Sequence, residues 1–92
     1  MGTTVRVPGV LRTETGGESQ LAVEAGGTLG AVLDELAVKW PRLERRIRDE
    51  QGQLRRYVNV YVDGEDCRRS GGLDAAVRDG GEVEVIPSVA GG

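Results

Sequence analysis

Histidine is absent from this chain of 92 residues, and cysteine occurs once, as Cys67. Without histidine, the Ser–His and Cys–His pairs of nucleophilic catalysis and the histidine-based metal sites are excluded. A single cysteine excludes an internal disulfide and suits a reducing cytoplasm. Because Cys67 has no histidine or second thiol to activate it, we expect a small, semi-buried apolar residue rather than a reactive thiol. The sequence therefore predicts neither an enzyme nor a metal site.

Aromatic residues and positive charge are also scarce. The chain has no Phe, one Trp and two Tyr, and its 15 acidic residues outnumber 12 basic ones, for a net charge of −3. This composition disfavours a nucleic-acid partner, which usually calls for a basic excess and stacking aromatics. No apolar run approaches the ~20 residues of a membrane span, and the first residues do not resemble a signal peptide. We expect a cytoplasmic protein that contacts no membrane.

The first quarter of the chain predicts a β-hairpin. Val5 and Val7 alternate with polar residues, which favours a strand over 4–12 with Pro8 at an edge or bulge. Two glycines at 15–18 favour a turn, and a second strand is expected over 19–24. The short connection makes the pair antiparallel.

One amphipathic helix follows. Thr28 has the side chain of a helix N-cap, and Pro41 ends the pattern. Between them the apolar residues fall on one helical stripe: Leu29, Val32, Leu33, Leu36, Ala37 and Trp40. The lead Gly26-Gly27 could instead cradle a phosphate, but it lacks the Gly-Lys-Ser/Thr ending and the spaced dinucleotide glycines, so a plain turn is favoured.

A short second helix is predicted over 42–50. The segment 42–56 contains six arginines and three acidic residues. Such a segment is usually a solvated charged face. The alternative is a docking patch for an acidic partner surface, and the sequence alone leaves both interpretations open.

The second half of the chain predicts mainly strands. Residues 56–62 alternate β-branched and aromatic side chains, and Asp63-Gly64 is a strong hairpin turn. A brief return is expected over 65–69, and Leu73, Ala76 and Val77 suggest a single helical turn. The last strand is expected over 82–87, with Val83 and Val85 facing the core.

This order of elements predicts an α+β fold in which one helix packs on a mixed sheet. We assign residues 1–87 to this domain and residues 88–92 to a flexible tail. The tail ends on Gly91-Gly92. Glycine lacks a Cβ, so the two residues form a thin thread that can enter a narrow slot in another protein. The chemical group that this thread presents is the α-carboxylate of Gly92.

Four stretches resemble the MoaD/ThiS family of ubiquitin-like, β-grasp sulfur carriers. They are Thr28-Leu29-Gly30-Ala31-Val32, Val58-Asn59-Val60-Tyr61-Val62, Asp79-Gly80-Gly81-Glu82-Val83 and Pro87-Ser88-Val89-Ala90-Gly91-Gly92. Tyr57 and the stretch Ser70-Gly71-Gly72-Leu73 are most similar to the carriers that actinobacteria use in cysteine biosynthesis. Cys67 departs from the aliphatic residue expected in the family, which adds a thiol that could compete in sulfur chemistry.

The resemblance implies a mechanism and partners. A ubiquitin-activating-type enzyme adenylates Gly92 with Mg-ATP, and a sulfur donor such as a sulfurtransferase or desulfurase converts the adenylate into a thiocarboxylate. An acceptor enzyme then uses the sulfur to make cysteine or a sulfur-containing secondary metabolite. The carrier itself binds no cofactor and is not an enzyme. Val89, Ala90 and Gly91 thread into the partner, and Tyr61, Asn59 and Pro87 are the expected partner face.

Three other functions remain open at this point. A ubiquitin-like modifier would join Gly92 to lysines through amide bonds, although Lys39 is the only lysine available for self-chains. A MoaD-type small subunit would complete molybdopterin synthase. An inert binding domain with a glycine tail is the third alternative.

Overall fold

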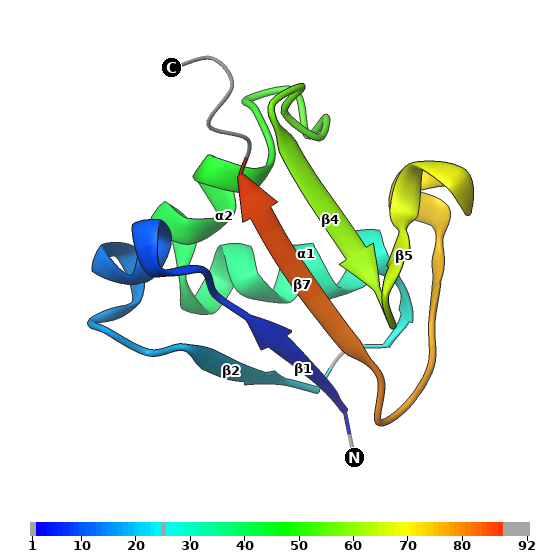
Figure 1. Cartoon of the computed structure of the whole chain (residues 1–92), viewed down its shortest axis with the longest axis horizontal. Helices are drawn as coiled ribbons and strands as arrows, with labels where there is room; N and C mark the ends of the chain where they lie inside the picture. Colours follow the sequence, from blue (N-terminus) through cyan, green and yellow to red (C-terminus); the bar gives the residue numbers. More distant parts are fainter. Residues whose placement is uncertain (1, 25, 88–92) are drawn as a thin grey trace.

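The computed structural model describes residues 2–24 and 26–87. A five-stranded mixed sheet lies in front of two helices in Figure 1, with α1 running across its rear face. The strands are β1 (Thr3–Arg6), β2 (Gln20–Val23), β3 (Gly27–Thr28), β4 (Val58–Val62), β5 (Glu65–Asp66), β6 (Ala76–Val77) and β7 (Glu82–Pro87). The helices are α1 (Leu29–Lys39), α2 (Pro41–Ile47) and three 3₁₀ helices, η1 (Gly9–Thr15), η2 (Cys67–Arg69) and η3 (Gly72–Asp74).

The last strand occupies the centre of the sheet. The order is β2-β1-β7-β4-β5, in which β7 runs parallel to β1 and antiparallel to β4. Val83 and Val85 of β7 and Val60 of β4 turn inward and are buried. The predicted α+β fold, with a mixed sheet packed on one main helix, is confirmed.

Helix α1 supplies most of the opposite half of the core. The Thr28 side chain accepts a hydrogen bond from the Ala31 N–H at 3.2 Å, which confirms the predicted N-cap. The buried residues of the helix are Leu29, Val32, Leu33 and Leu36. Ala37 and Trp40 of the predicted stripe are half-buried, so the helix turns partly away from the sheet towards its end.

The prediction of one strand over 4–12 is wrong beyond Arg6. Pro8 has no N–H to continue the ladder, and its carbonyl accepts a bond from the Leu11 N–H at 3.0 Å. Residues 9–15 therefore form η1, which buries Leu11 and leaves Val10 66% exposed. Gly16, with a φ of 66°, ends this helix in the left-handed region.

The predicted helical turn over 73–77 is only partly right. A 3₁₀ turn ends at Asp74, and Ala76 and Val77 form β6, which pairs antiparallel with β3. The Leu29 N–H also donates to the Ala75 carbonyl at 2.9 Å, so this segment covers the start of α1. A pairing of two residues with a distant partner has no periodicity that the sequence could reveal.

The predicted Asp63-Gly64 hairpin turn is confirmed, with φ of 49° and 86° at its two residues. The Asp63 carboxylate accepts bonds from the Glu82 N–H at 2.9 Å and from Arg78 Nε at 3.0 Å. These bonds, the Glu82 N–H foremost, hold the pKa of Asp63 below its ordinary value. The turn is thereby tied to the start of β7.

A buried ion pair links α2 to α1. The expected solvated face is wrong for Arg48 and Glu44, whose side chains are only 10% and 12% exposed. Arg48 Nε lies 2.6 Å from Glu44 Oε2, and Arg48 Nη2 lies 2.9 Å from Asp34 Oδ1. Burial by itself lowers the pKa of Arg48, but its bonds to Asp34 and Glu44 outweigh burial and raise it.

Candidate functional site

The candidate site begins where the described chain ends, at Pro87. Val89, Ala90, Gly91 and Gly92, the residues predicted to thread into a partner, lie outside the described residues. Pro87 is the last residue of β7 and stands opposite Val58, the first residue of β4. The ladder with β4 continues to Pro87, whereas the pairing with β1 covers only Glu82, Val83 and Glu84. The end of β7 is therefore held by β4 alone.

Two of the three residues predicted for the partner face lie together. Tyr61 and Asn59 are two positions apart in β4, so they share the face of the sheet that points away from α1. Their register partners on β7 are Glu84 and Ile86. Both predicted residues are half-buried, so the surface they offer is shared with their neighbours.

Pro87 does not share that face. The alternation of β7 places it on the side of Val83 and Val85, and it is half-buried. Ile86 takes the open face instead, where it is 41% exposed. Sequence reasoning missed Ile86, although the inward Val83 and Val85 imply by alternation that the residue after them points outward.

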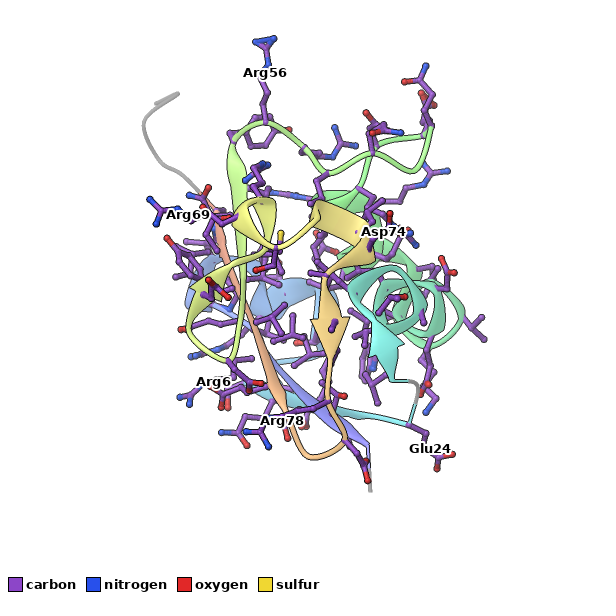
Figure 2. The ribbon with its side chains drawn as sticks, turned by 90° about the vertical axis from the view of Figure 1, so that its right-hand side faces the viewer. Arg6, Glu24, Arg56, Arg69, Asp74 and Arg78 are labelled. Atoms are coloured by element: carbon purple, nitrogen blue, oxygen red, sulfur yellow. The ribbon has the colours of Figure 1, made fainter. Side chains whose placement is uncertain are left out.

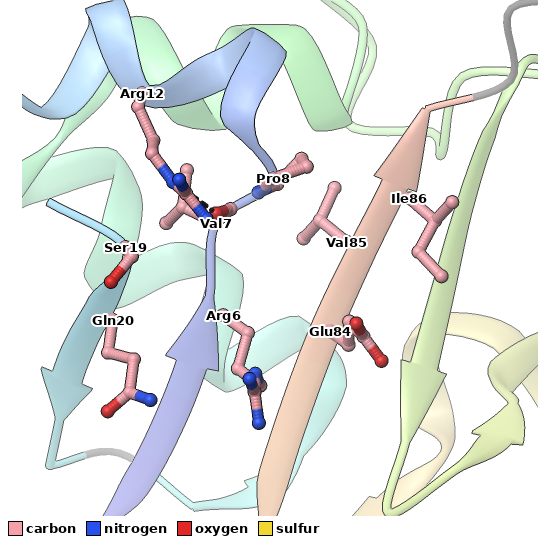
Figure 3. A pocket seen from close by; sticks show the side chains of 9 residues that line it. All are labelled: Arg6, Val7, Pro8, Arg12, Ser19, Gln20, Glu84, Val85 and Ile86. Atoms are coloured by element: carbon pink, nitrogen blue, oxygen red, sulfur yellow. Dashed lines mark hydrogen bonds between the residues drawn. The ribbon is translucent and has the colours of Figure 1, made fainter. Parts of the chain in front are cut away.

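A small hollow adjoins Ile86 on the open face. It forms where β1 ends and η1 turns away, while β7 continues, and its volume is about 190 Å³ (Figure 3). Its lining residues are Arg6, Val7, Pro8, Arg12, Ser19, Gln20, Glu84, Val85 and Ile86. Arg12 Nε donates to the Val7 carbonyl at 3.0 Å, which fixes one wall. The hollow adds polar and charged groups beside an exposed apolar side chain.

Arg68 stabilises the start of β4, which is the strand end that pairs with Pro87. Its guanidinium donates to the carbonyls of Arg55 and Val58, each at 3.0 Å, and to Asn59 Oδ1 at 3.2 Å. The start of β4, opposite Pro87, is thus held by one side chain from η2. No local pattern predicts this role, because Arg68 and its acceptors lie nine or more residues apart.

The loop before β4 adds a basic and aromatic edge at the same end of the molecule. Arg56 projects from this loop, at the end opposite Arg78 and Glu24 (Figure 2). Tyr57, the next residue, is 54% exposed and lies one position before β4. Figure 1 shows that β7 also ends at this end of the molecule.

The described residues offer little chemistry of their own. Cys67 is fully buried, and burial raises the pKa of its thiol above the ordinary value, despite the nearby Arg68 charge. Within residues 2–24 and 26–87 no cluster of His, Cys, Asp and Glu could hold a metal ion. In the same ranges no helix has the length and apolar character to cross a membrane.

The glycine-rich lead into α1 is not the plain turn favoured from the sequence, because Gly27 and Thr28 form β3 and pair with β6. The N–H groups of Leu29 and Ala31 donate to Ala75 and Thr28, so these donors are not directed at a phosphate.

A mixed five-stranded sheet packed on one main helix, with the last strand at its centre, is the architecture of a ubiquitin-like β-grasp protein. Residues 5–92 match the profile of the ThiS family, so the chain belongs to that family. The sulfur carrier protein CysO of Mycobacterium tuberculosis is 44% identical over 94 aligned positions, which cover 100% of both chains.

Solved structures agree with this assignment. CysO in the crystal structure of the Amycolatopsis orientalis BexX/CysO complex is 41% identical, with a TM-score of 0.89 over 99% of this chain and 100% of that one. In sequence, the small archaeal modifier protein 1 of Haloferax volcanii is also similar: it is 33% identical over 81 residues, covering 86% of this chain and 88% of the relative. The chain is thus a sulfur carrier of the ThiS family, whose members are not catalysts.

Proposed function

We propose that the chain carries sulfur as a thiocarboxylate on Gly92. The observation that carries this proposal is the full-length identity of 44% with CysO, together with the family match that extends through residue 92. The burial of Cys67 supports it, because it leaves no accessible thiol among the described residues to compete for sulfur.

The chemistry follows from the weakness of a carboxylate as an electrophile. A partner of the ubiquitin-activating type joins the Gly92 carboxylate to AMP, using Mg-ATP and releasing pyrophosphate. A donor that delivers hydrosulfide attacks the acyl carbon, the C–O bond to AMP breaks, and a C(=O)–S⁻ group and a proton result. An acceptor enzyme then takes the sulfur to make cysteine or a sulfur-containing metabolite. ATP and Mg²⁺ belong to the partner, and the carrier binds neither.

The open sheet face is the proposed partner surface. Tyr61 and Asn59 of β4 flank β7, the strand that leads to residues 88–92, and Ile86 lies on β7 itself. Pro87 is the last residue of that strand. An enzyme that threads Val89, Ala90 and Gly91 into its active site would rest against this face. The small hollow beside Ile86 gives such a partner a place for one side chain.

The test is ATP-dependent loading followed by intact-protein mass spectrometry. With an activating enzyme, Mg-ATP and a sulfide source, the wild-type chain should gain the mass difference of one sulfur replacing one oxygen, on its C-terminal peptide. Deleting Gly92, or adding one alanine after it, should abolish loading while the melting temperature moves by less than about 4 °C. Val38→Ala, at a side chain 82% exposed on α1, is the matched control and should load normally.

Two results would overturn the proposal. One is loading of the extended chain at the wild-type rate. The other is added sulfur that maps to Cys67.

The second candidate is a protein modifier that forms amide bonds to lysines. The identity of 33% with a protein named small archaeal modifier protein 1 favours it, since both functions begin with an acyl adenylate. Amide adducts of the wild-type chain on other proteins, without any thiocarboxylate, would replace the carrier proposal by this one.

A further inference from the structure

A second hollow lies on the helical side of the molecule, away from the open sheet face. Its volume is about 520 Å³, and it is formed by α2, the end of α1 and η1. Its lining residues are Glu14, Ala37, Pro41, Arg42, Glu44, Arg45 and Arg46. Apolar surface from Ala37 and Pro41 is thus combined with three arginines from one helix.

Two of these arginines already converge on a carboxylate. Arg46 Nη1 lies 3.5 Å from Glu14 Oε2, and Arg42 Nε lies 3.9 Å from Glu14 Oε1. The arginine side chains are 58% and 87% exposed, so these contacts contribute little to the stability of the fold. Each contact involves one nitrogen of a group with five N–H donors. The site therefore has the geometry for a carboxylate and retains donors for another.

The charge of the surrounding surface is one-sided. Residues 42–56 contain six arginines and three acidic residues, in a chain whose net charge is −3. One of the three acids is buried: Glu44 pairs with the buried Arg48. Its charge is therefore compensated by Arg48 and does not offset the arginines exposed on α2.

We propose that this hollow docks an acidic segment of a partner protein. Carboxylates of the segment pair with Arg42, Arg45 and Arg46, and an aliphatic side chain between them covers Ala37 and Pro41. Charge complementarity selects this occupant, and the apolar floor favours a polypeptide over a nucleic acid, whose stacked bases find no aromatic residue among the lining residues. The site shares no lining residue with the open sheet face, so the segment can bind while that face is engaged.

The test is a titration of the uniformly ¹⁵N-labelled full chain, followed by NMR. The probe is a short capped peptide of alternating glutamate and leucine, and the same peptide with glutamine for glutamate is its control. Shifts should concentrate on α2, Glu14 and Ala37. Binding should weaken at least about fivefold between 0.1 M and 1 M salt, where the Debye length falls from about 10 Å to about 3 Å. The glutamine peptide should not bind.

Three variants sharpen the test. The double variant Arg42→Gln, Arg46→Gln should lose peptide binding, with an unchanged circular dichroism spectrum because both side chains are exposed. Glu14→Gln should bind the peptide more tightly than wild type, because it removes the carboxylate already between the arginines. The matched control Arg6→Gln, Arg78→Gln changes two exposed arginines of other surfaces and should bind like wild type.

Each opposite result overturns the proposal. The first is that the Arg42→Gln, Arg46→Gln variant binds the peptide as tightly as wild type, and the second is that Arg6→Gln, Arg78→Gln loses binding to the same extent. The third is that Glu14→Gln binds more weakly than wild type. The fourth is that a short single-stranded RNA displaces the peptide at equal charge concentration. If Gly92 does not accept sulfur, the peptide-binding result at α2 is unaffected. The two proposals can therefore be rejected independently of each other.

Discussion

Cys67 is the residue whose environment most limits its chemistry. It is fully buried, and burial raises the pKa of its thiol, whereas the thiolate is the reactive form. Iodoacetamide should therefore alkylate Cys67 only as the chain unfolds, and Cys67→Ala should accept sulfur at the wild-type rate. Mass spectrometry after timed alkylation in buffer and in denaturant checks the first expectation. Native alkylation as fast as that of a free cysteine peptide would contradict it.

Asp63 should make stability depend on pH. Its folded pKa is lowered, so the carboxylate stabilises the fold above its unfolded pKa of about 3.9, and this contribution is lost as pH falls through the folded value. The free energy of unfolding of wild type should exceed that of Asp63→Asn at pH 7. The difference should shrink as pH falls below about 4. Asparagine tolerates the φ of 49°, so the variant tests the charge.

Urea unfolding at pH 7, 4 and 3 provides this measurement. A difference between wild type and Asp63→Asn that stays constant over this range would show that the carboxylate has no special role. Gly64 retains its φ of 86° in both proteins, so the turn itself is common to them.

At the scale of elements, α1 allows a matched pair of truncations. Leu33 is fully buried and Val38 is 82% exposed on the same helix. Leu33→Ala should lower the free energy of unfolding by about 2–5 kcal/mol, because it removes core contacts and leaves a cavity. Val38→Ala should change it by no more than about 0.5 kcal/mol. Denaturant unfolding compares the two, and equal losses would show that α1 is rotated from the described orientation.

The link between α1 and α2 can be tested in the same way. Arg48→Ala leaves the Glu44 carboxylate in the interior without its cation, which typically costs about 3–5 kcal/mol. Asp34→Asn should cost no more than about 1 kcal/mol, because the Asp34 side chain is 74% exposed. Thermal unfolding of both variants checks the order, and the double variant Glu44→Gln, Arg48→Met should recover part of the loss.

Elements with a long repeat of their own were predictable from the sequence. The stripe on α1 and the alternation in β7 each span several turns or residues, and β7 matches the predicted bounds of 82–87. The two-residue strands β3 and β6 stabilise each other across almost fifty positions, so neither carries a local signal. The same reason hides η1, whose direction depends on Pro8 and on the burial of Leu11.

At the scale of the whole molecule, one part of the candidate site could be predicted from the sequence and the other part could not. The role of Gly92, which lies outside the described residues, is a prediction from the sequence and its family resemblance, and it needs no neighbour from the fold. The surroundings of the exit depend on topology. Ile86 meets Asn59 only because β7 inserts beside β4, and Arg68 reaches the start of β4 from η2.

The central place of β7 has a mechanical consequence. A force applied at Gly92 is directed along the axis of β7, which is paired with β1 and β4 on its two sides (Figure 1). The hydrogen bonds to β4, and those to β1 at Glu82–Glu84, must then shear together, whereas a force across an edge strand would open its bonds one at a time. A protease or unfoldase that grips the tail should therefore stall at Pro87. In single-molecule pulling, two attachment points are compared. The force needed to unfold the chain should be higher when it is pulled from Gly92 than when it is pulled from an anchor on β2.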